Sequence, residues 1–230
     1  MIPLNVPEND TWQQLNHDII TCRRCPRLVK WREEVAETKR RAYEDWDYWG
    51  KPVPGFGDRN AQILILGLAP GAHGSNRTGR MFTGDSSGET LFGTLYRTGF
   101  ANQPTAESRN DGLKLNNVFI TAVGRCVPPK NRPTAQELTN CRPFLAREIA
   151  LLPRLQVIVA LGHVAFKGYL RLLQEAGVAK PKITFSHGER YQMPVGPELV
   201  ASYHPSRQNT QTGRLTLEMF DQVFENLCQA

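Results

Sequence analysis

Four short apolar runs, each followed by a loop rich in glycine or proline, constrain the fold of this chain more than any other feature. They are Gln62–Gly67, Asn117–Ala122, Gln156–Leu161 and Glu198–Ser202. Apolar and β-branched residues follow one another with little polar alternation, which is typical of strands buried on both faces of a parallel sheet. Segments of helical length separate the runs. The sequence therefore predicts an α/β fold with a central four-stranded parallel sheet flanked by helices.

The helical segments between and around these runs complete the predicted architecture. Thr134 to Glu137 has the form of a capping box and opens a helix whose inward face carries Leu138, Cys141, Leu145 and Ile149. Further helices are predicted over Ser86–Thr98, Thr216–Cys228 and a charged region, Pro26–Asp47, whereas Phe100–Lys114 is polar and predicted to be a loop. We expect one three-layer domain over residues 1–230, with residues 1–20 as an N-terminal extension.

Charge and cysteine content narrow the class of protein. The net charge of +6 favours an acidic partner, above all nucleic acid, although many basic proteins bind none. No apolar run is long enough to span a bilayer, and the polar start lacks the apolar core of a secretory signal. We expect a cytoplasmic monomer with no membrane contact. An odd count of five cysteines argues against a disulfide framework.

The positive charge gathers in three loops that follow predicted strands. Pro70–Gly84, Thr121–Gln136 and Ala201–Leu217 contain no Asp or Glu but carry seven cations: Arg77, Arg80, Arg125, Lys130, Arg132, Arg207 and Arg214. Ligands of such sheets bind outside the carboxyl ends of the strands, where these loops converge. A positive field at that edge suits a polyphosphate backbone, although any one of these cations could be an ordinary solvated surface charge.

Four of the cysteines have the arrangement of a metal or cluster site. Cys22 and Cys25 form a CxxC pair, and Cys126 and Cys141 follow far along the chain. From spacing alone these thiolates suit zinc or a 4Fe-4S cluster, and ordinary core packing is an equal alternative for the second pair. Cys228, near the terminus, is predicted not to be a ligand.

Two long motifs resemble those of a known family. Gly67–Asp85 is similar to the first motif of the family 5 (type B) uracil-DNA glycosylases, and His204–Thr216 is similar to the second. The four cysteines match the family's ligands in order and spacing. The resemblance thus implies a structural 4Fe-4S cluster held by Cys22, Cys25, Cys126 and Cys141, tying the N-terminal helical extension to the domain. It also implies a base-excision repair enzyme that flips a damaged base out of DNA and hydrolyses its glycosidic bond without cutting the strand.

The resemblance assigns a role to each of several side chains. His204 matches the histidine that hydrogen-bonds the uracil carbonyl as negative charge builds there. Asp85 matches a carboxylate that positions water or stabilises the cationic sugar, and its structural alternative is a helix N-cap. Phe82 matches the ring that stacks on the flipped base, with core packing as its alternative. Asn131 matches an asparagine that contacts base or water, and a turn residue is its alternative.

The same two motifs supply further predicted contacts. We assign contact with the base to Gly67, Ala69, Gly71 and His73 of the first motif. The resemblance places the loop after His204 in the minor groove, where it fills the vacated stack. The predicted DNA-binding residues are Arg77, Arg80, Arg207, Gln208, Asn209 and Arg214.

Departures from other branches of the superfamily indicate a broad choice of base. Leu68 and Ala69 stand where other branches carry an acid or amide, and Ala122 stands where they carry an asparagine that reads uracil. The absence of this asparagine predicts that the enzyme acts on hypoxanthine and other deaminated bases besides uracil. Three rival interpretations stay open: a family 4 type uracil-specific glycosylase, a noncatalytic iron–sulfur DNA-binding protein, and a zinc-bearing nucleotide-binding module.

Overall fold

The four apolar runs form the centre of the sheet in the computed structural model, which describes residues 2–228. They are β2 (Ile63–Gly67), β3 (Val118–Ala122), β4 (Val157–Leu161) and β6 (Glu198–Ser202), each within a residue of its predicted bounds. They pair in parallel in the order β3-β2-β4-β6, with Ile63 level with both Val118 and Val157. All residues of β2 and β3 are buried, which explains why these runs show no polar alternation.

The sheet is wider than predicted, and it is mixed. Two short strands, β1 (Phe56–Gly57) and β5 (Arg190–Tyr191), extend it to six strands by pairing antiparallel with β3 and β6 at its two edges. Each has only two residues, too few for a recognisable alternation of side chains. The expected four-stranded, wholly parallel sheet is therefore corrected to a parallel centre with antiparallel edges.

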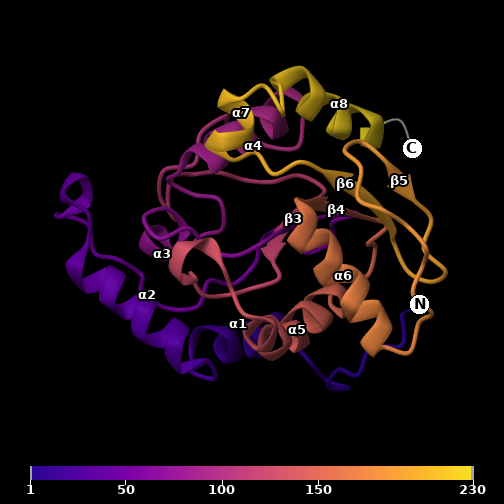
Figure 1. Ribbon diagram of the computed structural model, residues 1–230, viewed down its shortest axis with the longest axis horizontal. Coiled ribbons are helices and arrows are strands. Elements are labelled where there is room, and N and C mark those ends of the chain that lie inside the picture. The colour runs from indigo at the N-terminus through magenta and orange to yellow at the C-terminus, as the bar shows by residue number, and fades with distance from the viewer. Residues whose placement is uncertain (1, 229–230) are drawn as a thin grey trace.

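Helices cover both faces of this sheet (Figure 1). On one face, α4 (Ser86–Arg97) and α8 (Leu217–Cys228) pack over Ile63 and Ile65; on the other, α5 (Ala135–Ala150) and α6 (His163–Glu175) pack over Leu64 and Leu66. Because successive side chains of a strand point to opposite faces, each β-strand contributes to two separate cores. The α/β class is confirmed, with two helical layers around the sheet.

Local signals set the beginnings of the two helices that matter most for the site. The side chain of Asp85 caps α4 by accepting from Ser87 N (3.1 Å) and Gly88 N (3.0 Å). The predicted capping box of α5 is present, with Thr134 and Glu137 bonding each other's backbone amides. Cys141, in the middle of α5, points inward and is buried, as its spacing indicated.

The N-terminal extension is packed against the domain. It contains α1 (Trp12–Ile20), whose Leu15 and Ile19 are fully buried against Phe144 of α5. The next helix, α2 (Pro26–Thr38), is shorter than the predicted Pro26–Asp47 and ends at Lys39, which has a φ of 51°. A 3-10 turn, η1 (Arg41–Tyr43), follows it.

Three short elements complete the carboxyl edge of the sheet: α3 (Ser75–Thr78), η2 (Pro129–Asn131) and α7 (Arg207–Gln211). Each lies in one of the three basic loops, so the loops that the sequence predicted to converge carry some helical structure. Within residues 2–228, no helix has both the length and the apolar character needed to cross a bilayer. The side chain of Cys228, predicted not to bind metal, lies outside the described residues.

Candidate active site

A cavity of about 360 Å³ opens at the carboxyl ends of the central strands, where loops after β2, β3 and β6 meet. That volume lies within the range of small-molecule sites. Six residues predicted to bind or react with the base line it together: Ala69, Gly71, Phe82, Asp85, Asn131 and His204. Residues up to 135 positions apart in the sequence are thereby brought to one hollow, as the topology of the sheet requires.

Phe82 forms one wall of this cavity in a strained conformation. Its φ of 55° lies in the left-handed region, which a bulky residue rarely adopts. The ring presses on Gly67, where any Cβ would lie 2.8 Å from the ring, so only glycine allows this placement. It is also stacked on the imidazole of His204, with centroids 5.9 Å apart. Phe82 is thus both buried and presented to the cavity.

The two carboxylate oxygens of Asp85 have different surroundings. Oδ1 caps α4, as described above, whereas Oδ2 has no hydrogen-bond partner among the described residues. Oδ2 lies against the backbone of Gly71 and Gly74, where an added Cβ would stand 3.0 and 2.2 Å from it. Burial raises the pKa of Asp85 above its ordinary value. The N-cap and the chemical role are therefore compatible, since each uses a different oxygen.

His204 brings a neutral imidazole to the same cavity. Burial lowers the pKa of His204 to about 4, because the charged ring would lose its hydration. Its ring makes no hydrogen bond to any described residue, although its backbone carbonyl accepts from Asn209 Nδ2 at 2.8 Å. A neutral imidazole still has one N–H to donate, and that donor is free for a ligand.

The remaining predicted contacts divide into two groups. Asn131 lines the cavity from an exposed turn with a φ of 55°, so its alternative role as a turn residue also holds. Gly67 and His73 do not line the cavity. Gly67 supports the ring of Phe82 from behind, and His73 bonds the hydroxyl of Tyr48 at 3.1 Å. Burial lowers the pKa of His73 below its ordinary value.

Several other residues line the cavity but were not predicted from the sequence to contact the base. They are Leu68, Ser75, Met81, Ser87, Pro128 and Ser206. All lie in the two motifs, in the loop after β3, or in the first turn of α4. Their neighbourhood was therefore a usable signal, but their individual orientation depends on how the three loops fold against one another.

The side chains of Arg77 and Arg80, which were predicted to bind phosphates, are buried in the structure. Both guanidinium groups are inside the protein: Arg77 lies between the rings of Tyr43 and Trp46, 3.9 and 4.0 Å from their centroids, and donates to the carbonyl of His73. Arg80 forms a two-point ion pair with Asp111, the shorter contact being 2.6 Å. These arginines hold the first motif in shape.

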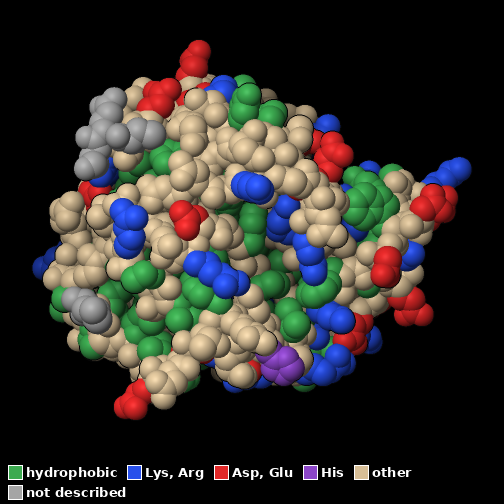
Figure 2. All heavy atoms as spheres, turned by 180° about the vertical axis from the view of Figure 1, so that it is seen from behind, with side chains coloured by type: hydrophobic (Ala, Val, Ile, Leu, Met, Phe, Trp, Pro, Cys, Tyr) green, Lys and Arg blue, Asp and Glu red, His purple; other side chains and the backbone are tan. Residues whose placement is uncertain are grey.

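The other predicted DNA contacts are at the surface. Arg207 and Gln208 are exposed on α7, and exposed Arg214 lies over the ring of Tyr203 at 4.6 Å. Asn209 is partly buried and fixes α7 to His204. Lys and Arg side chains also gather toward the middle of the face behind Figure 1, with most Asp and Glu toward its outline (Figure 2).

The four predicted ligand cysteines meet at a second, small cavity. Cys22 follows α1, Cys25 caps α2, Cys126 lies in the loop after β3, and Cys141 lies in α5. Burial raises the pKa of Cys126 to about 12 and also raises that of Cys141. Among the described residues, no three His, Cys, Asp or Glu side chains form a group that could hold one metal ion.

Buried cations surround these sulfur atoms. Arg32 donates through Nη1 to Cys126 Sγ (3.0 Å) and to the carbonyl of Cys22 (3.2 Å), and Asn140 donates to Cys25 Sγ (3.3 Å). Arg125 lines the same cavity and pairs with Glu148 at 2.6 Å. The Nε atoms of both arginines are buried without a hydrogen-bond partner. Four thiols and unsatisfied cationic donors fit an anionic sulfur cluster.

Comparison with known proteins decides the family. A model of the uracil DNA glycosylase superfamily matches residues 54–228. A type-5 uracil-DNA glycosylase from Mycobacterium tuberculosis is 51% identical over 212 residues, covering 92% of this chain and 78% of that protein. One from Thermus thermophilus is 53% identical over 205 residues, covering 89% and 91% of the two chains. The chain belongs to the type-5 branch of the uracil-DNA glycosylase superfamily.

Membership of the type-5 branch confirms the resemblance that the two motifs indicated. It also separates the chain from the family 4 alternative. A type-4 uracil-DNA glycosylase from Pyrobaculum aerophilum is only 32% identical over 199 residues, covering 84% of this chain and 82% of that protein, against 51% and 53% for the two type-5 proteins. The superfamily match includes every residue that lines the cavity of Phe82, Asp85 and His204.

Proposed function

We propose that this protein is a base-excision repair enzyme that removes uracil from DNA by hydrolysing the bond between the base and deoxyribose. One observation carries the proposal: Phe82, Asp85 and His204 line a single cavity in a chain of the type-5 uracil-DNA glycosylase branch. A base inside a duplex cannot reach such a cavity, so the nucleotide is extruded before it reacts.

The cavity holds the extruded base by its face and by its edge. The ring of Phe82, fixed by Gly67 and His204, offers a flat apolar surface for stacking. Asn131 and the backbone at Ala69 and Gly71 supply polar groups along the lining. Because the strained φ of Phe82 is maintained by the packed motif around it, the stacking surface exists before the base arrives.

The chemistry places opposite charges on the two halves of the breaking bond. As the bond between C1′ and the base nitrogen breaks, its electron pair leaves with the base, and the sugar becomes cationic. The N–H of neutral His204 donates to the base carbonyl on which negative charge develops. Asp85 Oδ2, which has no partner among the described residues, stabilises the cationic sugar, orients the water that bonds to C1′ and accepts the proton that this water loses.

We infer two finer features of the activity from the cavity and from the end of β3. No lysine is among the described residues of the cavity, so no amine is placed to form a Schiff base with C1′, and the product is an abasic site in an uncut strand. Ala122 ends β3 beside Gly67 and offers no polar side chain to read a base edge. We therefore infer action on hypoxanthine and related deaminated bases as well as uracil.

Binding to DNA is assigned to the exposed side chains around the cavity. Arg207 and Gln208 project from α7, directly after His204, and Arg214 lies nearby on Tyr203. Their position supports insertion of this loop beside the extruded nucleotide, with the two arginines on phosphates.

We further propose that Cys22, Cys25, Cys126 and Cys141 hold a 4Fe-4S cluster. Its role is to join the turn between α1 and α2 to β3 and α5, which a covalent link between distant segments does well. The unsatisfied Nε atoms of Arg32 and Arg125 support an anionic occupant. A brown protein containing iron, and loss of both in Cys126→Ser, would exclude the zinc-bearing alternative.

The experiment that tests the function uses end-labelled DNA with one uracil, treated with alkali after incubation and run on a denaturing gel. Strand cleavage at the uracil is expected for the native protein and is strongly reduced in Asp85→Ala and His204→Ala. Matched controls are Asp45→Ala and His17→Ala, which remove the same groups from exposed positions outside the cavity. Intact DNA with a folded, brown protein would instead support the noncatalytic DNA-binding alternative. Parallel substrates with hypoxanthine and adenine test the base range, and equal rejection of both would contradict it.

A further inference from the structure

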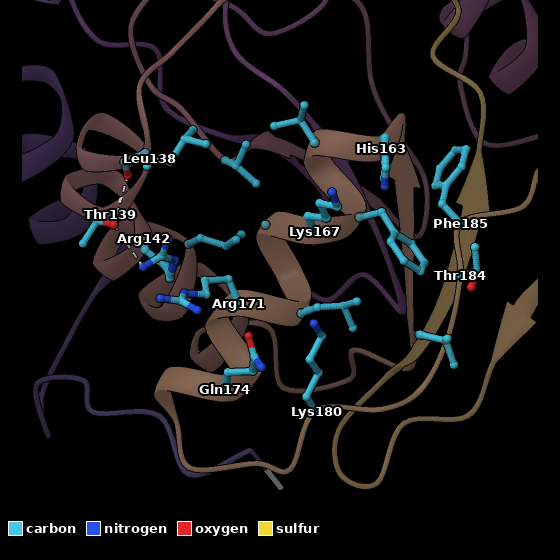
Figure 3. Close-up of a pocket in the computed structure, with 18 residues that line it drawn as sticks. Leu138, Thr139, Arg142, His163, Lys167, Arg171, Gln174, Lys180, Thr184 and Phe185 are labelled. Carbon is cyan, nitrogen blue, oxygen red and sulfur yellow. Dashed lines mark hydrogen bonds between the residues drawn. The ribbon is translucent and has the colours of Figure 1, made fainter.

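A second cavity, larger than the candidate active site, lies on the face of the sheet covered by α5 and α6. Its volume is about 620 Å³, and it is bounded by α5, α6 and the segment 180–185 that follows α6 (Figure 3). It shares no lining residue with the cavity of Asp85 and His204. The proposed glycosylase reaction therefore leaves it without a role.

The floor of this cavity is apolar and partly aromatic. Phe185 packs against Phe166 and against the ring of His163, with both centroid distances at 5.5 Å. Further apolar lining comes from α5, α6 and the following segment: Leu138, Leu145, Leu170 and Ile183. An apolar hollow open to solvent on this scale is typical of a binding site.

The rim of the cavity is cationic. Four basic side chains line it, namely Arg142, Lys167, Arg171 and Lys180, and no Asp or Glu does. Arg142 from α5 and Arg171 from α6 extend toward each other at one end, whereas His163 and Phe185 lie together at the other (Figure 3).

Only part of this positive charge is neutralised inside the protein. Glu175 forms ion pairs with both Arg142 and Arg171, the second at 3.9 Å. Lys167 and Lys180 are exposed and have no acidic partner among the described residues. The rim thus presents a net positive charge above an apolar floor.

We propose that this cavity binds an acidic peptide segment of a partner protein, with an aromatic or branched aliphatic side chain seated on the apolar floor and carboxylates at the rim. The charge of the rim selects an anionic partner, and the apolar floor selects a side chain over a phosphate, which gains nothing from contact with Leu138 or Phe185. A nucleic-acid strand is the main competing occupant. It would need cations without so large an apolar surface.

The test measures binding of a fluorescein-labelled peptide, Asp-Asp-Phe-Leu-Asp-Asp, to the whole protein by fluorescence anisotropy. Two peptides serve as controls: Lys-Lys-Phe-Leu-Lys-Lys, which reverses the charge, and Asp-Asp-Ser-Ser-Asp-Asp, which removes the apolar pair. Saturable binding of the first peptide alone is expected. The double variant Lys167→Glu and Lys180→Glu should weaken that binding at least about tenfold, since two attractive charges become repulsive. The control variant Lys30→Glu and Lys114→Glu, with the same charge change at exposed positions outside the cavity, should leave it unchanged.

Phe185→Ala tests the apolar floor separately and should also weaken binding, with a melting curve showing that the variant is folded. Uracil excision by the two lysine variants should match that of the native protein. Absence of peptide binding, or equal binding of the serine-containing peptide, would overturn the proposal. If the Lys167 and Lys180 variant instead lost affinity for DNA and the peptide did not bind, this face would be part of the nucleic-acid surface. The peptide-binding results do not depend on whether the glycosylase activity is present.

Discussion

Asp85→Asn separates the two roles that the structure gives to one carboxylate. Asparagine keeps an oxygen in the place of Oδ1, which accepts from Ser87 and Gly88 at the start of α4. It replaces Oδ2, the atom against Gly71 and Gly74 in the cavity, by an uncharged group. If the account is right, the helix cap survives this substitution and the chemistry does not.

The expected magnitudes differ enough to be measured apart. Asparagine and aspartate are about equally good N-caps, so the free energy of unfolding should change by less than about 1 kcal/mol. Loss of a positioned carboxylate should slow base release about 10²- to 10⁴-fold, equivalent to about 3–5 kcal/mol in the barrier. Asp85→Ala should show the same loss of rate together with about 0.5–2 kcal/mol of lost stability, because it also removes the cap.

The assay is single-turnover excision from uracil-containing DNA, combined with denaturant unfolding of the same preparations. Burial raises the pKa of Asp85, and the ionised carboxylate is the active form. As the pH is lowered, the rate of the native protein should therefore begin to decrease at a higher pH than an ordinary aspartate would give. That acid limb should be absent in Asp85→Asn. A rate within a few-fold of native in Asp85→Asn, with reduced stability in Asp85→Ala, would show that the carboxylate serves only as a helix cap.

Two other predictions concern pH and charge. Burial lowers the pKa of His204 to about 4 in the folded chain. As the pH decreases from 6.5 to 4, the unfolded chain therefore takes up a proton that the folded chain does not. The free energy of unfolding should decrease over this window by up to about 3 kcal/mol. The melting temperature of His204→Gln should decline less steeply over this window than that of the native protein, because buried His73 still contributes a decline of the same sign, and equal slopes for the two proteins would contradict the prediction. Arg80→Ala, which leaves the Asp111 carboxylate unpaired, should cost about 3 kcal/mol of stability without changing the salt dependence of DNA binding. Arg207→Ala should leave the stability unchanged and reduce the steepness of log affinity against log salt by about 0.9. If both variants changed the salt dependence of DNA binding, the distinction between a buried and a DNA-contacting arginine would be refuted.

The four main strands were predictable because burial on both faces leaves a local record in the sequence. Every residue of β2 and β3 is buried, so their apolar runs are continuous and end where the chain emerges. The edge strands β1 and β5 left no such record. With two residues each, they exist only because the chain passes beside β3 and β6. Their pairing is a property of the assembled sheet.

The residues of the candidate site were also predictable in part. The burial of Arg77 and Arg80 was not, because it depends on contacts between distant segments. Topology brings the loops after parallel strands to one edge, which is how Ala69, Asn131 and His204 came to line one cavity. Charge type alone does not tell an exposed arginine from a buried one. Arg77 and Arg80 contact aromatic rings and a carboxylate from distant segments, whereas Arg207 contacts no such group within residues 2–228.

Arg32 was missed although its position carried a signal. It lies between Leu28 and Val35 on the buried stripe of α2, where an arginine needs a partner that is not in its own helix. Its partners are the sulfur of Cys126, far along the chain, the carbonyl of Cys22, and Glu33 of the same helix at 3.9 Å. A cation on an inward helical stripe next to a CxxC pair was therefore a pointer to the cysteine cavity.

If the extruded base enters the cavity of Phe82, Asp85 and His204, a side chain that fills this cavity should block excision. Ala69→Phe places a ring in the lining and leaves those three side chains unchanged. Free uracil released from a uracil-containing duplex would be measured by mass spectrometry for the native and substituted proteins, together with their melting temperatures and DNA affinities. A folded Ala69→Phe protein should bind DNA within a few-fold of native and release almost no uracil. Native release by the filled variant would contradict the account, because the base would then react elsewhere.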